Sequence, residues 1–166
     1  MKETPNLGFR TVRGYQLANR REDGLTPALE DYLEMVYRLC SEDGYARVGK
    51  LSELLHVKPS STSKMILKLV NRGYLEYDPY DSICLTGKGQ EAGAYLLARH
   101  DTTEEFLRLI GNTSPLEEAE LIEHSLSTST VTGIKTLLAF FARNPEINTE
   151  YEAFKKTDLP ASPSDR

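Results

Sequence analysis

The first half of the chain contains the pattern that most constrains the fold: two short helices separated by a tight turn and followed by two short apolar segments. The first helix is expected over 48–55, residues 56–58 form the turn, and a proline opens the second helix, which ends near Gly73. Residues 74–77 and 82–85 are rich in Tyr, Leu and Ile and flank an Asp-Pro-Tyr-Asp turn, which is typical of a β-hairpin. Two helices around a turn with a hairpin directly behind them predict a winged helix-turn-helix.

Helical signals continue on both sides of this region. Thr26 and Pro27 form an N-cap and a first helical turn, and apolar residues then recur at helical spacing until Gly44. A long helix is expected after Thr86, which is a suitable N-cap. Three shorter helices are expected over 116–126, 131–143 and 147–156. The fold class is therefore predicted to be mainly α, with an N-terminal winged helix-turn-helix and a helical second part.

The net charge of −5 is distributed unevenly along the chain. Residues 47–72 carry six basic side chains against one acidic side chain, whereas residues 101–166 carry twelve acidic against six basic ones. The basic side chains coincide with the helix-turn-helix pattern, and local basic patches matter more for binding nucleic acid than the net charge does. The alternative interpretation is that these lysines and arginines only keep a short helical region soluble.

The second helix of the helix-turn-helix has two different faces. Ile66, Leu69 and Val70 can face the core, and the opposite side then presents small polar and basic residues, which suit the major groove of double-stranded DNA. Serine and threonine at a helix start often only cap the helix, so these residues alone are weak evidence. DNA contacts are predicted for Arg47, Lys58, Pro59, Ser60, Ser61, Thr62, Lys64, Lys68, Arg72 and Tyr80.

Acidic and histidine side chains recur at helical spacing in three separate segments. One segment contains Glu120, Glu123 and His124 at i, i+3 and i+4, so all three would share the same face of a helix. A similar i, i+3 relation joins Asp31 and Glu34, and His100 lies in a third predicted helix. A single residue of these types is usually solvated or structural, but four carboxylates and two imidazoles together suit a hard or borderline divalent metal ion.

Other sequence features limit the class of protein. Cys40 and Cys84 have no CxxC spacing, so we expect reduced, packed thiols and neither a disulfide framework nor a zinc knuckle. No apolar stretch reaches the roughly 20 residues that a membrane helix needs, and no signal-peptide core is present, so we expect a cytoplasmic protein without membrane contact. Four parts are predicted: a mobile arm (1–25), a winged helix-turn-helix DNA-binding domain (26–92), a helical dimerisation and metal-binding domain (93–156) and a flexible tail (157–166).

Four separated segments resemble one known family. They are Leu29-Glu30-Asp31-Tyr32-Leu33-Glu34, the block from His56 to Met65, Leu85-Thr86-Gly87-Lys88-Gly89, and the run from Ile122 to Ser127. In this order they are similar to the diphtheria-toxin-repressor family, and most similar to its manganese-responsive branch. Members of that branch are homodimeric winged-helix repressors that bind palindromic operator DNA when loaded with Mn(II).

The resemblance implies a two-metal site formed by Asp31, Glu34, His100, Glu120, Glu123 and His124. Iron-responsive members have a methionine where this chain has Asp31 and a cysteine where it has Glu120, so these two positions favour Mn(II). The expected cofactor is two Mn(II) ions per subunit, with Fe(II), Co(II) or Zn(II) as substitutes, because affinity alone ranks Mn(II) below them. The expected function is repression of manganese uptake genes by a homodimer.

Charge suggests how such a site would act as a switch. Four carboxylates without metal should repel one another, and two divalent cations would draw the helices together and fix the spacing of the DNA-binding parts. Three alternatives remain: an iron-responsive regulator, a winged-helix DNA binder that ignores metal, and a dinuclear metallohydrolase, which would require an open coordination position and a substrate cleft. No separate acid, base or nucleophile motif supports the enzyme.

Overall fold

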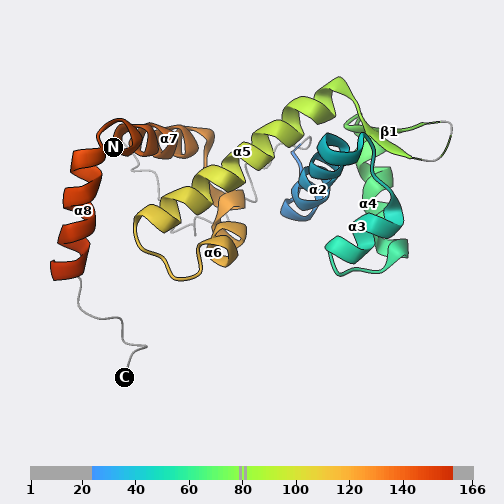
Figure 1. Cartoon of the computed structure of the whole chain (residues 1–166). Helices are drawn as coiled ribbons and strands as arrows, with labels where there is room; N and C mark the ends of the chain where they lie inside the picture. Colours follow the sequence, from blue (N-terminus) through green and yellow to red (C-terminus); the bar gives the residue numbers. More distant parts are fainter. Residues whose placement is uncertain (1–23, 79, 81, 159–166) are drawn as a thin grey trace, which may run out of the picture.

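The computed structural model describes residues 24–78, 80 and 82–158, and it consists of two helical parts joined by one long helix (Figure 1). The predicted arm, apart from residues 24 and 25, and the predicted tail beyond residue 158 lie outside the described residues. The elements are α2 (Pro27–Asp43), α3 (Val48–Leu54), α4 (Pro59–Asn71), β1 (Leu75–Tyr77), β2 (Ile83–Leu85), α5 (Gly87–Leu109), α6 (Pro115–Ile122), the 3₁₀ helix η1 (Glu123–Ser125), α7 (Thr128–Arg143) and α8 (Pro145–Asp158). The predicted mainly α fold with a winged helix-turn-helix is confirmed.

Local signals set the ends of α2. The Thr26 side chain accepts a hydrogen bond from the backbone N–H of Leu29 at 3.4 Å, and Pro27 occupies the first turn, where its missing N–H costs nothing. Gly44 ends the helix with a φ of 83°, a left-handed conformation that glycine adopts without a Cβ clash. The predicted limits of this helix are therefore confirmed.

The wing is a two-stranded antiparallel hairpin behind α4, as predicted. Leu75 pairs with Leu85 and Tyr77 pairs with Ile83. The Asp78 carboxylate closes the turn by accepting hydrogen bonds from the backbone N–H groups of Tyr80 and Ser82, at 2.8 and 2.7 Å. An Asp side chain that binds the backbone two residues ahead is a common way to stabilise such a turn.

The core of the winged part lies between α2, α3, α4, the wing and the start of α5. Leu33, Val36, Leu51, Ile66 and Leu69 are completely buried there. Burial of these apolar side chains is the main source of stability for short helices that would not be stable alone.

Thr62 also lies in this core, which corrects its predicted place on the DNA-binding face. Its side chain is completely buried, and the Ser52 hydroxyl donates a hydrogen bond to it at 3.0 Å. The Tyr32 hydroxyl lies 3.5 Å away on the other side. The serines and lysines around Thr62 in α4 are exposed, so helical periodicity turns this one hydroxyl inward.

Two glycines of α5 lie close against neighbouring segments. A Cβ at Gly89 would overlap the carbonyl oxygen of Tyr74, and a Cβ at Gly93 would lie 2.7 Å from atoms of the Tyr37 ring and its Cβ. Thr86 caps the helix by accepting a hydrogen bond from the backbone N–H of Gly89 at 3.1 Å. The predicted domain boundary after residue 92 falls inside this continuous helix.

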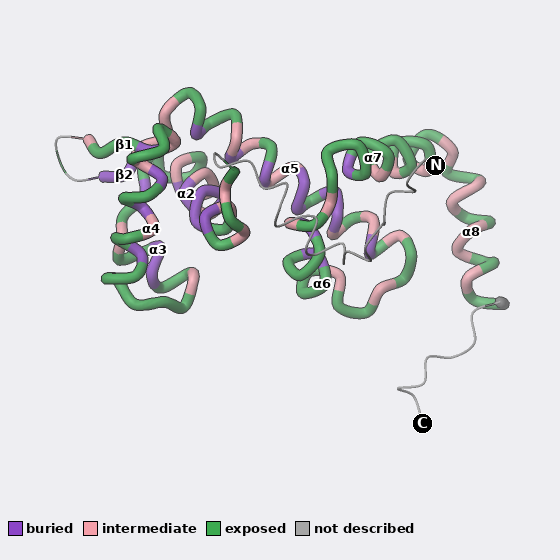
Figure 2. The backbone as a smooth tube through the Cα atoms, turned by 180° about the vertical axis from the view of Figure 1, so that it is seen from behind, coloured by how far each residue is buried: buried purple, intermediate pink, exposed green. Residues whose placement is uncertain are grey.

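The helices after α5 depart from the prediction at one point. An uninterrupted helix over 116–126 is wrong, because α6 ends at Ile122 and residues 123–125 form the 3₁₀ helix η1. Helices α7 and α8 begin three and two residues earlier than expected. Figure 2 shows that buried residues concentrate in the winged part and along α5, whereas α7 and α8 are mostly exposed. In the described part of the chain, no helix is long and apolar enough to cross a membrane.

Candidate metal centre and DNA-binding face

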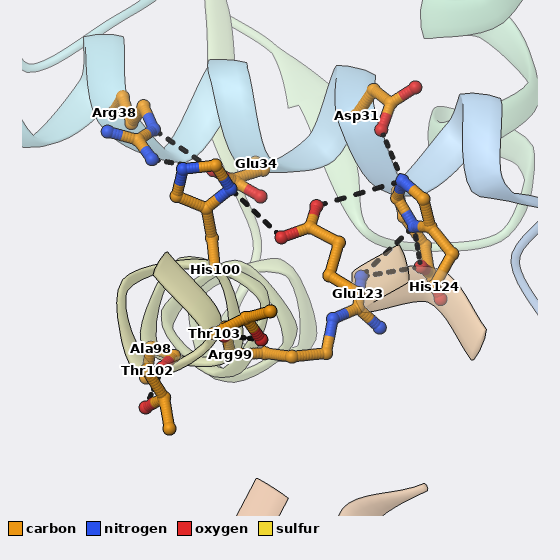
Figure 3. A network of polar contacts seen from close by, with 11 residues as sticks. Asp31, Glu34, Arg38, Ala98, Arg99, His100, Thr102, Thr103, Glu123 and His124 are labelled. Atoms are coloured by element: carbon orange, nitrogen blue, oxygen red, sulfur yellow. Dashed lines mark hydrogen bonds and ion pairs between the residues drawn. The ribbon is translucent and has the colours of Figure 1, made fainter. Parts of the chain in front are cut away.

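Five of the six predicted metal ligands converge where three elements meet. Asp31 and Glu34 point from α2, His100 points from α5, and Glu123 and His124 belong to η1 (Figure 3). The sequence positions of these residues are up to 93 residues apart, so only tertiary packing brings them together.

The five residues form two groups of three that share Glu123. One group is Asp31, Glu123 and His124, the other is Glu34, His100 and Glu123, and in each group the ligand atoms lie within 4.8 Å of one another. His124 Nε2 is 3.0 Å from Asp31 Oδ1 and 3.7 Å from Glu123 Oε1, whereas His100 Nδ1 is 2.9 Å from Glu123 Oε2. Each oxygen of Glu123 thus serves a different triad, and Glu123 is almost completely buried, with 3% of its surface exposed.

Glu120, the sixth predicted ligand, is not part of either triad. It is exposed on α6, on the wall of a groove of about 880 Å³ that both triads also line. Leu54, Leu55 and His56 from the helix-turn-helix line the same groove. The prediction assumed one helical face for Glu120, Glu123 and His124, and the change to a 3₁₀ helix at Glu123 breaks that face.

The donor set fits a hard or borderline divalent cation. Both triads offer carboxylate oxygens and one imidazole nitrogen, and neither contains a thiolate. Oxygen ligands with imidazole suit Mn(II) and related ions, whereas soft metals prefer sulfur. The free cysteines, Cys40 and Cys84, lie outside both triads, and burial raises the pKa of the Cys40 thiol to about 11, so it stays protonated.

The predicted DNA-binding residues are exposed, except for Thr62. The exposed ones are Arg47, Lys58, Pro59, Ser60, Ser61, Lys64, Lys68, Arg72 and Tyr80. Tyr80, in the wing turn, is 85% exposed. Arg72 also donates a hydrogen bond to the Gly24 carbonyl at 3.0 Å, so part of its hydrogen-bonding capacity is used within the chain.

Comparison with known protein families accounts for both halves of this arrangement. Residues 24–83 match the family described as iron dependent repressor, N-terminal DNA binding domain, and residues 86–152 match iron dependent repressor, metal binding and dimerisation domain. The chain belongs to the iron dependent repressor family. It therefore combines a DNA-binding domain with a domain for metal binding and dimerisation, and it falls in a class of regulators and not of enzymes.

Individual proteins similar to this repressor are also named as transcriptional or manganese regulators. The protein named HTH-type transcriptional regulator MntR from Bacillus pumilus is 41% identical over 79% of this chain and 92% of that protein. The protein of the same name from Lysinibacillus sphaericus is 42% identical over 78% of this chain and 95% of that one. The solved structure of the manganese regulator SloR is 30% identical with a TM-score of 0.62, and the match spans 70% of this chain but only 55% of SloR.

The carboxylates of the repressor's centre form ion pairs with basic side chains of the same chain. Arg38 binds Glu34 Oε1 through Nε and Nη2, at 3.0 and 2.8 Å, and Arg99 Nη2 binds Glu30 Oε2 at 2.8 Å. His124 contacts Glu30 and Asp31 as well. These pairs offset part of the negative charge of the centre, and the electrostatic separation of α2, α5 and η1 without metal stays a prediction.

The same contacts shift the pKa values of the two histidines and of Glu30. The pKa of His124 rises to about 9 because its side chain forms hydrogen bonds with Asp31 and, next in strength, with Glu30. The pKa of His100 is also raised, by its hydrogen bond to Glu123, although burial opposes the rise. Burial alone would raise the pKa of Glu30, but the hydrogen bonds from His124 and Arg99 outweigh burial and lower it. At neutral pH His124 thus carries a proton that a metal ion would replace.

Sequence reasoning missed Glu30, Arg38 and Arg99 as members of the centre. Glu30 and Arg99 directly precede the predicted ligands Asp31 and His100, and Arg38 lies four residues after Glu34. The i, i+4 spacing of Glu34 and Arg38 is a usable signal for an ion pair on one helix. For Glu30 and Arg99 no comparable signal exists, because their contact joins α2 to α5 over 69 residues.

Proposed function

We propose that this chain is a manganese-activated repressor that binds palindromic operator DNA as a homodimer and controls genes for manganese uptake. The observation that carries the proposal is Glu123, whose two carboxylate oxygens each belong to a separate triad of oxygen and nitrogen ligands. Two triads support two metal positions per subunit. The names of the MntR relatives and of the manganese regulator SloR support Mn(II) as the ion.

The ligands come from both parts of the chain. Asp31 and Glu34 lie on α2, within the residues that match the DNA-binding domain, whereas Glu123 and His124 lie in the helical second part. A bound divalent cation would supply positive charge that holds these ligands together. The arrangement of the ligands around the cation then fixes the orientation of the winged part relative to the dimerisation domain. DNA binding gains affinity because the two winged parts of the dimer are already oriented for it.

Glu120 is proposed as a sixth ligand that joins after a local change. If α6 continued as an α-helix through residue 124, Glu120, Glu123 and His124 would share one face. Glu120 already lines the groove that contains both triads, and this change would involve the backbone of η1, which carries Glu123 and His124. Fe(II), Co(II) and Zn(II) are proposed as substitutes, because the same ligand types bind them at least as strongly as Mn(II).

Dimerisation is proposed through the exposed apolar side chains of the second part. Leu137 and Phe140 on α7 and Phe154 on α8 are 41%, 47% and 60% exposed. A two-fold dimer presents two α4 helices, which must lie about 34 Å apart, or a multiple of that distance, to enter successive major grooves. Operator DNA lies in the cytoplasm of a bacterium, so we propose that the protein acts there.

The proposal is tested by DNA binding of metal-stripped protein to a fragment of its own upstream region, with Mn(II), Fe(II), Co(II) and Zn(II) titrated separately without oxygen. We expect Mn(II) to increase the affinity strongly. Equal binding with and without every metal would exclude a metal-dependent repressor and leave a winged-helix DNA binder. Activation by Fe(II) but not by Mn(II) would favour the iron-responsive alternative.

Lys64→Ala should weaken binding to every DNA sequence to a similar extent. Lys64 is exposed on α4, where a lysine contacts phosphate without reading the base sequence. Loss of one phosphate contact should make the slope of log affinity against log salt less steep by about 1. Fluorescence anisotropy across a salt series measures this slope. Lys135→Ala on α7 is the control, and an equal change in both variants would show that only net charge matters.

Arg38→Met should strengthen Mn(II) binding roughly tenfold at low salt, the effect of one positive charge several ångströms from a divalent ion in a water-like medium. Arg38 holds Glu34 in the second triad, with 38% of its own side chain exposed. Isothermal titration calorimetry measures the affinity. Arg108→Met removes a similar i, i+4 pair with Glu104 on α5 and should leave the affinity unchanged. Arg38→Lys keeps the charge, so an equal gain in that variant would contradict the electrostatic explanation.

A further inference from the structure

The two ring nitrogens of His124 face different surroundings. Nε2 points toward the first triad, 3.0 Å from Asp31 Oδ1 and 3.7 Å from Glu123 Oε1. Nδ1 points away from the triad and lies 2.7 Å from Glu30 Oε2. Glu30 belongs to neither triad, although it directly precedes Asp31 on α2.

Glu30 also contacts a second side chain, Arg99. Arg99 Nη2 on α5 donates a hydrogen bond to the same Glu30 Oε2 at 2.8 Å, and Arg99 is only 4% exposed. His124 Nδ1 and Arg99 Nη2 lie 3.1 Å apart because they share this acceptor oxygen. A buried guanidinium thus holds Glu30 in place through Oε2, the same oxygen that contacts His124 Nδ1.

This geometry has a known chemical consequence. A histidine that binds metal through one nitrogen usually donates the N–H of the other nitrogen to a carboxylate, which sets the tautomer and the orientation of the ring. When Nδ1 donates its proton to Glu30, the lone pair for a cation is on Nε2. That is the nitrogen that already faces Asp31 and Glu123.

We propose that Glu30 is a positioning residue that makes Nε2 the metal-binding nitrogen of His124, and that Arg99 holds Glu30 for this role. The inference rests on the proposed function, since it assumes that a cation binds the first triad. It also explains why Glu30 belongs to neither triad although it directly precedes Asp31: Arg99 and His124 share its Oε2.

The alternative is that Glu30 and Arg99 only join α2 to α5. A structural ion pair would change the melting temperature when it is removed, but it would not change which nitrogen of His124 binds metal. Glu30→Gln keeps the shape and a weaker acceptor, and Glu30→Ala removes the acceptor. A positioning role therefore predicts graded loss of Mn(II) affinity, largest for Ala at roughly 10- to 100-fold.

Two measurements on the full-length dimer test the proposal. Calorimetric titration with Mn(II) gives the affinity, and ¹⁵N NMR of the histidine-labelled, Zn(II)-loaded protein shows which ring nitrogen of His124 binds the ion. We expect Nε2 coordination and a slowly exchanging Nδ1 proton in the original protein. In Glu30→Ala we expect weaker binding with mixed coordination or a rapidly exchanging Nδ1 proton.

The outcomes separate this proposal from the proposed function. If the original protein binds neither Mn(II) nor Zn(II) through His124, the proposed function fails and this inference fails with it. If it binds both ions, but Glu30→Ala binds them as tightly and with the same His124 signals, only the positioning role is overturned. Glu42→Gln, an exposed change on the same helix, controls for net charge, and circular dichroism confirms that each variant is folded.

Discussion

Glu123→Gln is expected to weaken Mn(II) binding at least 100-fold and to abolish metal-dependent binding to operator DNA. Glu123 is the one residue that contributes to both triads, through Oε1 toward His124 and Oε2 toward His100. Glutamine has the same shape but no charge, and its amide nitrogen cannot bind a cation. Loss of a residue that only orients a ligand already costs 10- to 100-fold in metal affinity, so loss of a shared ligand should cost more.

The measurement is a calorimetric titration with Mn(II), followed by DNA binding with and without the ion. Glu118→Gln makes the same change at an exposed position of α6. This variant should bind Mn(II) and operator DNA as the unchanged protein does. Removing one partner of a buried ion pair also destabilises a fold, so thermal unfolding of both variants must be recorded. A folded Glu123→Gln protein that still binds operator DNA only with Mn(II) would refute the coupling through this residue.

Gly89→Ala is expected to destabilise the protein by about 3 kcal/mol, the upper end of the usual cost of inserting a methyl group into a packed contact. The new Cβ would overlap the Tyr74 carbonyl oxygen, and neither group is free to move. This carbonyl accepts hydrogen bonds from the backbone N–H and the hydroxyl of Thr86, both at 3.1 Å. Gly89 lies in the first turn of α5, where the wing joins the helix that leads to the metal centre.

A loss of this size should lower the melting temperature by about 6–12 °C for a chain of this length. Calorimetry at one fixed protein concentration measures the shift, because the stability of a dimer depends on concentration. Gly87→Ala, two residues earlier, is the control: no atom lies within 4 Å of its new Cβ, and alanine is the better helix former. An unchanged melting temperature in Gly89→Ala would mean that the wing and α5 do not pack as described.

Local signals in the sequence predicted the order and type of the helices well. Thr26, Pro27 and Gly44 set the ends of α2 through hydrogen bonds and backbone angles that involve only neighbouring residues. Pro59 opens α4 in the same way, and the Asp78 turn produces the wing. Such effects depend on residues close in sequence, so the sequence shows them directly.

Residue type and helical spacing were less reliable at individual positions. Thr62 was grouped with its polar neighbours by residue type, although it lies four residues before Ile66 and seven before Leu69, on the buried face of α4. The break between α6 and η1 has no marker in the sequence, because Glu123 carries no helix-breaking feature. Spacing therefore predicted Glu123 and His124 correctly as neighbours in one place, but it also grouped Glu120 with them.

The sequence by itself determined the mainly α winged-helix fold, the location of the basic residues and the type of ligands available for metal. Propensity, caps and charge are properties of short segments, so they do not require the final packing. The tertiary structure alone decided that Glu123 serves two triads, that Arg38 and Arg99 pair with the acidic residues, and that Glu30 faces Nδ1 of His124. These features depend on distances between α2, α5 and η1, and such distances exist only after the chain has folded.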